Sequence, residues 1–248
     1  MGFQNRFLPY TINLMALTKK KVLQVIFEKL ADKIKIYDFN SFPKEQSFVR
    51  RNVDTVFIFQ LLIYDRTNIK TGAKGFLVEP FIWINVKLIE EYYKEITLNK
   101  ELKKDTDFVT LGASIAELLS NPDGIHRKWN ESLDLFVFEE KHVEIIAKEL
   151  IKQFEKFALS YFLKNGNVQA VDRLLNLHPN EYCVHMSNDL FRFIKGLIAA
   201  RLNSNPKLES LLKTYDRLII ERDMPDHCKE EMSRLKSILP MVGTHITV

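Results

Sequence analysis

The sequence predicts an α+β protein: an antiparallel sheet of four to six strands with packed helices, followed by an all-helical C-terminal region. Two long runs rich in β-branched and aromatic residues, 54–66 and 76–87, flank a connector with Gly and Lys, 67–75. This arrangement is typical of a hairpin with a long loop. Shorter strand patterns surround the hairpin, and from about Asn188 onward only helical periodicity remains.

The first long run is apolar on both of its faces. One face carries Thr55, Phe57, Phe59, Leu61 and Ile63, and the other carries Val56, Ile58, Gln60, Leu62 and Tyr64. A strand of this kind needs a helix over one face and a helix, a second layer or a partner over the other. Pro80 in the second run cannot donate a ladder hydrogen bond, so we expect an edge position or a bulge there.

Shorter elements precede and follow the hairpin. Thr18 is the predicted N-cap of an amphipathic helix of about four turns. Residues 37–46 are expected to form a loop and residues 47–52 a short strand. Residues 108–115 and 133–138 are predicted as further strands.

Helical patterns dominate the second half of the chain. The clearest helix opens near Glu139, and Asn167 can cap a short helix after Gly166. Gly112, inside a predicted strand, indicates a bulge or the close approach of another backbone. We therefore divide the chain into an α+β body, residues 1–160, and a helical C-terminal region, residues 161–248, that docks on the body.

Composition limits the classes of function. The chain has 248 residues, 46% hydrophobic and 27% charged, with a formal charge of +4. This excess is only mildly basic and does not favour a dedicated nucleic-acid binder. No apolar run approaches the roughly 18 residues of a transmembrane helix. Cys183 and Cys228 lack CxxC spacing, which favours a reducing cytoplasm while leaving one long-range disulfide open.

The order of features from residue 47 to residue 175 resembles an uncharacterised bacterial family, a domain of unknown function. The resemblance rests on the strand with Gln60, the strand with Gly112, the pair His126-Arg127 and the helix that leads into residues 158–175. It implies a small α+β protein with no assigned reaction, in gene neighbourhoods of toxin immunity or phage defence. It implies no catalytic residue.

The sharpest enzyme-like pattern is Asp123, followed by Glu139 and Lys141 at the end of an apolar strand. Nucleases of the PD-(D/E)xK type bring two carboxylates and a lysine around a divalent metal that activates water. The competing interpretation is that Asp123 belongs to a turn, while Glu139 and Lys141 lie in the first turn of a helix. The metal-dependent nuclease is therefore our alternative function.

Other residues are candidates for interactions. Arg66, Lys70 and Lys74 can gather at one end of the hairpin and attract an anion, although a solvated rim is the default interpretation. His126 and Arg127, with Trp129 beside them, have the chemistry favoured at protein-interface hot spots.

No nucleotide-binding or common hydrolase motif is present in the sequence. We therefore predict a non-enzymatic bacterial protein without a cofactor or resident metal. It would bind another protein, as an immunity or defence component, and nucleic acid is a less favoured partner.

Overall fold

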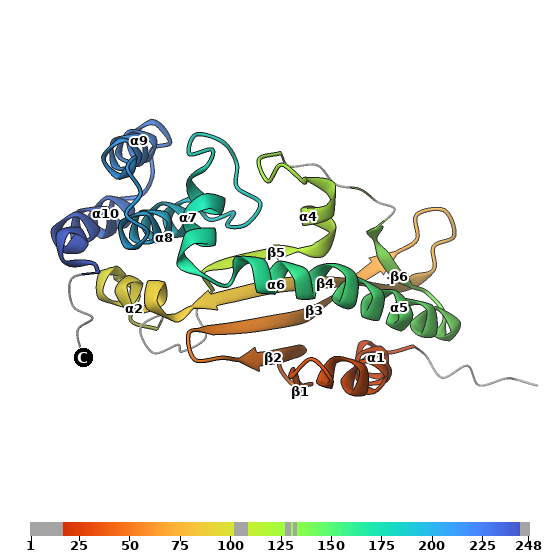
Figure 1. Ribbon diagram of the computed structural model, residues 1–248. Coiled ribbons are helices and arrows are strands. Elements are labelled where there is room, and N and C mark those ends of the chain that lie inside the picture. Colours follow the sequence, from red (N-terminus) through yellow and green to blue (C-terminus); the bar gives the residue numbers. More distant parts are fainter. Residues whose placement is uncertain (1–16, 102–108, 127–129, 131–132, 244–248) are drawn as a thin grey trace, which may run out of the picture.

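The computed structural model describes residues 17–101, 109–126, 130 and 133–243. In this part of the chain an antiparallel sheet of six strands lies beside a group of C-terminal helices (Figure 1). The strand order is β1-β2-β3-β4-β5, and β6 also pairs with β4. The strands are β1 Asn40–Phe42, β2 Ser47–Arg51, β3 Thr55–Thr67, β4 Lys74–Val86, β5 Leu111–Ser114 and β6 Leu135–Val137. The predicted fold class is confirmed.

The hairpin of β3 and β4 is the centre of the sheet. Its two strands of 13 residues pair from Thr55 opposite Val86 to Thr67 opposite Lys74. The side chain of Asn68 accepts hydrogen bonds from two backbone N–H groups of the connecting loop, which holds the turn in place. The predicted long hairpin is thus present.

The expectation for Pro80 was wrong, because β4 is a central strand with an unbroken register against β3. On its other side, β4 pairs with β6 through residues 76–78 and with β5 through residues 81–84. Pro80 lies in the interval between these two neighbours, where no ladder hydrogen bond is demanded of it.

Helices cover one face of the sheet, as Figure 1 shows for α5 and α6. The helices and helical turns are α1 Lys19–Lys35, α2 Lys87–Ile96, α4 Ile115–Ser120, α5 Glu140–Gln153, η2 Phe154–Ala158, α6 Leu159–Asn165, α7 Val168–Asn176, α8 Asp189–Leu202, α9 Leu208–Glu221, α10 Asp226–Ile238 and η3 Leu239–Met241. Thr18 caps α1 and Asn167 caps α7, as predicted. Among the described residues, no helix combines the length and apolar character needed to cross a membrane.

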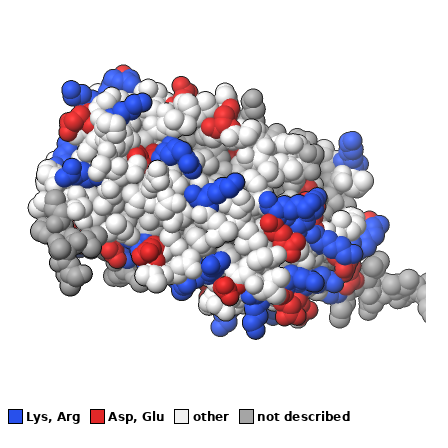
Figure 2. Space-filling view, viewed as in Figure 1, with Lys and Arg blue, Asp and Glu red and all other residues white. Residues whose placement is uncertain are grey.

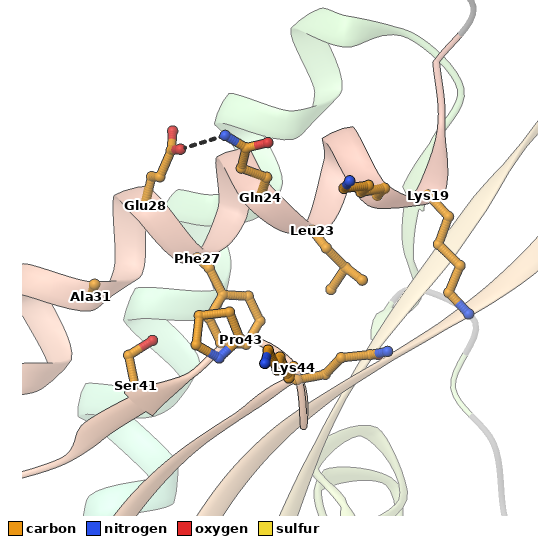
Figure 3. A pocket seen from close by; sticks show the side chains of 11 residues that line it. Lys19, Leu23, Gln24, Phe27, Glu28, Ala31, Ser41, Pro43 and Lys44 are labelled. Atoms are coloured by element: carbon orange, nitrogen blue, oxygen red, sulfur yellow. Dashed lines mark hydrogen bonds between the residues drawn. The ribbon is translucent and has the colours of Figure 1, made fainter.

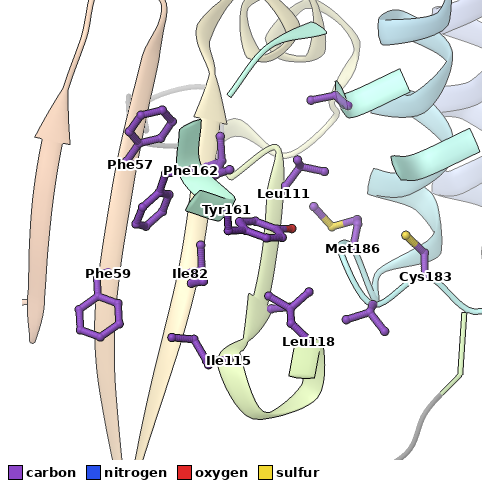
Figure 4. Packing of buried hydrophobic residues seen from close by; sticks show 14 of the residues in the cluster. Phe57, Phe59, Ile82, Leu111, Ile115, Leu118, Tyr161, Phe162, Cys183 and Met186 are labelled. Carbon is purple, nitrogen blue, oxygen red and sulfur yellow. The ribbon is translucent and has the colours of Figure 1, made fainter. Parts of the chain in front are cut away.

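The main apolar core lies between the sheet and these helices. Phe57 and Phe59 of β3 point into it, and Figure 4 shows Phe162 of α6 beside Phe57. Phe59 is fully buried and contacts Phe154 edge to face, with 5.2 Å between the ring centroids. The odd-numbered face of β3 is therefore the covered one.

The C-terminal helices belong to the same apolar cluster as the sheet. The predicted boundary between residues 160 and 161 falls inside α6, which continues from α5 through η2 without a loop. α8 packs between α7, α9 and α2, and it brings the buried Lys195 to the buried Glu90 of α2. The body and the helical region therefore share one core.

Two local predictions need correction. Residues 37–46 were expected to be a loop, yet β1 forms within them and pairs with β2. The strand predicted over residues 133–138 is limited to β6, and α5 begins two residues after Phe138.

Candidate functional site

The face of the sheet opposite the helices is rich in apolar and aromatic side chains. Register and alternation place eleven such residues on it: Phe42, Val49, Val56, Ile58, Leu62, Tyr64, Leu77, Phe81, Trp83, Phe136 and Phe138. Val49, Val56 and Leu77 are buried, and the others are partly or largely exposed. None of them belongs to the apolar cluster that joins the sheet to the helices, nor packs against it. We call these residues the open face.

Trp83 lies flat at the centre of the open face. Its indole N–H donates a 2.8 Å hydrogen bond to Oε1 of Gln60, and its ring stacks on Phe81 with centroids 5.2 Å apart. The ring also covers Gly112, where a Cβ atom would stand only 2.0 Å from the indole. Gly112 stays in register with Trp83. The predicted bulge is therefore wrong, but the alternative, the close approach of another backbone, is confirmed, because the Gly112 N–H donates a 2.8 Å hydrogen bond to the His185 carbonyl.

A second aromatic pair extends the open face along β6. Phe136 and Phe138 stack with 5.7 Å between centroids, and Phe136 is 38% exposed. Phe138 lies against Gly75, where a Cβ atom would stand 2.5 Å from the ring. Two glycines thus allow two aromatic rings to lie flat on the neighbouring strand.

Glu79 gives the open face a partly buried acidic group. It lies opposite Leu62 in the register of β3 and β4. Burial raises the pKa of Glu79 most, a hydrogen bond from Ser114 lowers it, and nearby Asp134 and Glu117 raise it further. The positive charge of Arg66 acts in the opposite direction. A carboxylate in this setting favours a cationic partner.

A separate groove runs between α1 and the hairpin of β1 and β2 (Figure 3). It has a volume of about 760 Å³. Leu23, Phe27 and Pro43 give it apolar walls, and polar and charged side chains form its rim. We call this the α1–β1 groove.

A third concave region lies between α2, α8 and α10. Its buried acid, Glu231, accepts hydrogen bonds from the Thr97 hydroxyl at 3.0 Å and from the Leu98 backbone N–H at 2.8 Å. These bonds tie the chain after α2 to α10. The acid therefore has a structural task in holding the helical region to the body.

The residues of the nuclease alternative are held by local contacts. The Asp123 carboxylate accepts from the Ile125 N–H and lies 2.6 Å from Nδ1 of His126, and these contacts hold its pKa below the usual range. Glu139 is the N-cap of α5 and pairs with Lys141 at 2.6 Å. No cluster of three or more His, Cys, Asp or Glu side chains suited to a metal ion occurs among the described residues.

The strand that the alternative requires is absent. β6 ends at Val137, and α5 begins at Glu140, so Lys141 lies in a helix. The nuclease alternative needs the strand to extend through Lys141, and that condition is not met. The competing interpretation, a turn at Asp123 and a helix start at Glu139, is confirmed.

Some of the predicted interaction residues lie in the described part of the chain, and others do not. Arg66 lies at the rim of the open face, with its guanidinium 5.7 Å from the centroid of the Tyr64 ring, while Lys70 and Lys74 are exposed at the same end of the hairpin. Arg127 and Trp129 lie outside the described residues. Their predicted neighbour His126 is half exposed and contacts Asp123.

Charge on the face seen in Figure 2 is mixed, because basic and acidic side chains alternate over α1 and α5. Lys21 and Glu140 form one ion pair between these helices, and Lys29 and Glu144 form another. A broad basic stripe suited to phosphates is not visible on this face.

Neither the open face nor the α1–β1 groove was predicted as a site from the sequence. The apolar even-numbered residues of β3 were one available signal, since they required a second layer or a partner. The groove had no comparable signal in the sequence, because its two walls come from separate segments and neither segment alone has a pattern that indicates a binding site. No protein-family model, curated protein or solved structure matches this chain.

Proposed function

We propose that this protein binds another protein through the open face of its sheet and catalyses no reaction. The observation that supports this is the aromatic centre formed by Phe81 and Trp83, outside the apolar core. Large apolar patches on a folded surface mark interaction sites, and Trp and Tyr dominate binding hot spots. The hydrogen bond from Trp83 to Gln60 fixes the indole before a partner arrives.

The chemistry of the open face defines the partner. Its apolar rings are complementary to an apolar partner surface. Partly buried Glu79 is complementary to an Arg or Lys side chain of the partner. The resemblance of residues 47–175 to a bacterial family supports an immunity or defence role for this recognition. The free thiols of Cys183 and Cys228, both buried, support the proposed cytoplasmic location.

The test compares matched variants of the full-length chain as bait in lysate from its native host. Phe81→Ser combined with Trp83→Ser removes the centre of the open face. Ile145→Ser removes an apolar side chain that is 63% exposed on the helix-covered side. A stoichiometric partner captured by the wild type and by the Ile145 variant, and lost with the double variant, is expected.

Affinity measured with the purified partner completes the test. Loss of a hot spot worth at least about 2 kcal/mol weakens binding by about thirtyfold. A partner bound equally by the double variant would contradict the proposal. Recovery of no stoichiometric partner by the wild type would count against it just as strongly.

A further inference from the structure

One side of the α1–β1 groove is formed by Ser41 of β1 and by the β1–β2 turn, and β1 has a free edge. The strand order places β1 at the end of the sheet, where it pairs only with β2. All three residues of β1 are exposed, and no hydrogen bond from another described element satisfies its outer edge. A strand at a sheet edge offers backbone N–H and C=O groups to an added strand.

A row of side chains from α1 lies along this edge. Leu23, Phe27 and Ala31 follow one another at intervals of four residues, so they share one side of the helix. Figure 3 shows Leu23 and Phe27 directed toward Pro43 and Lys44 of the β1–β2 loop. Phe27 also stacks on Phe48 of β2, with 4.7 Å between the ring centroids, which fixes the helix over the sheet.

One end of the groove carries unbalanced positive charge. Lys19, Lys20 and Lys44 line it, and none of them makes an ion pair with a described residue. Lys21 and Lys29 of the same helix are instead paired with acids of α5. The N-terminus of α1 lies at the same end and adds the positive pole of the helix dipole.

We propose that the α1–β1 groove binds an extended peptide segment of a partner protein, which adds as a strand to β1. Alternate apolar side chains of the peptide pack against Leu23, Phe27 and Ala31, because side chains of a strand alternate between its faces. Acidic residues of the peptide lie beside Lys19, Lys20 and Lys44. The inference rests on the proposed function only in that the ligand is protein, since the groove and the open face share no residue.

The probes are synthetic peptides selected from a displayed library of random 12-residue sequences against the full-length chain. We expect the selected peptides to alternate apolar residues and to carry acidic residues at one end. Their dissociation constants, measured by fluorescence anisotropy, should rise at least tenfold for Leu23→Asp. They should be unchanged for Ile36→Asp, which alters an exposed apolar residue at the end of α1.

Charge reversal tests the polarity of the groove. Lys19→Glu, Lys20→Glu and Lys44→Glu combined should weaken acidic peptides at least tenfold and strengthen versions in which the acids are replaced by lysine. Circular dichroism and thermal melting confirm that each variant is folded. Enrichment of no peptide, or equal binding to the Leu23→Asp variant, would overturn the inference.

A peptide of residues 1–16 of this chain is the competing occupant, because Leu17, the first described residue, is two positions before Lys19 of the groove. Displacement of the selected peptides by this synthetic segment would overturn the assignment to a partner. The Phe81→Ser, Trp83→Ser variant separates the two proposals. If the peptides still bind this variant while the lysate partner is lost, the two surfaces are independent. If the peptides fail to bind while the lysate partner is still captured, only the groove proposal is overturned.

Discussion

The partly buried His185 imidazole links stability to pH. Burial lowers its pKa to about 4, and the positive charge of Arg173 acts in the same direction. Its Nδ1 atom lies 2.7 Å from the Tyr161 hydroxyl. Because the unfolded chain binds a proton near pH 6.5 and the folded chain does not, folding loses free energy as the pH falls from about 6.5 toward 4.

We therefore expect His185→Gln to reduce the pH dependence of stability in this window. For a pKa shift of roughly 2.5 units, the protonation of His185 changes the free energy of unfolding by about 3 kcal/mol over this window. Urea unfolding of wild type and variant at pH 7, 6, 5 and 4 measures it. Equal slopes for the two proteins between pH 6.5 and 4.5 would show that His185 protonates normally in the folded state.

The ion pair of Glu90 and Lys195 is nearly inaccessible to water. The Lys195 ammonium lies 2.9 Å from Glu90 and donates to the Val109 carbonyl at 2.6 Å, while Glu90 accepts from the Thr110 hydroxyl. Burial lowers the pKa of Lys195, and the charge of Glu90 raises it. The pair joins α2 to α8, and its bonds to residues 109–110 fix the chain that leads into β5.

Removing one partner leaves the other charge buried alone. Lys195→Met should destabilise the protein by about 3–5 kcal/mol, whereas Lys195→Met with Glu90→Met should recover most of that loss. Chemical unfolding of the single and double variants gives the coupling energy. Additive effects would mean that the two groups do not interact in the folded protein.

At the scale of elements, neighbouring residues of β3 distinguish the two faces of the sheet. Phe59 is fully buried under the helices, and Ile58 is only partly buried on the open face. Phe59→Asp should abolish cooperative folding, because it places a charge without a partner in the core. Ile58→Asp should keep the native circular dichroism spectrum. A folded Phe59→Asp protein would refute the assignment of the core.

Gly112 allows the Trp83 ring to lie flat, so a methyl group there should displace the ring. Gly112→Ala, in a Trp129→Phe background that leaves one indole, should shift tryptophan emission to longer wavelength as Trp83 becomes more exposed. The hydrogen bond to Gln60 should break with it. Unchanged emission would indicate that the strands separate enough to accommodate the methyl group.

Several elements could be predicted from local pattern alone. The apolar stripe Val22, Ile26 and Leu30 identifies α1, and two long β-rich runs identify β3 and β4. β1 could not be predicted, because Asn40–Phe42 is short, exposed at all three residues and without alternation. The prediction of an edge or a bulge at Pro80 was wrong, because the gap between β5 and β6 depends on residues far away in the sequence.

At the scale of the whole molecule, the sites depend on which face the helices cover. β3 is apolar on both faces, so its sequence cannot tell the covered face from the open one. That choice comes from the packing of Phe154 and Phe162 against Phe57 and Phe59. The α1–β1 groove likewise requires an amphipathic helix and an edge strand to be placed side by side.

One apolar cluster extends from β2 to α10, which predicts a single unfolding transition for the body and the C-terminal helices. Phe59→Leu in the sheet and Phe193→Leu in α8 alter fully buried rings about 130 residues apart in the chain. Both should lower the midpoint of the same thermal transition, whether it is followed by calorimetry or by far-ultraviolet circular dichroism. Hydrogen exchange should show that the Phe193 variant weakens the protection of β4 as much as that of α9. If exchange instead rises only in α7–α10, the helical region unfolds on its own and the shared core is not cooperative.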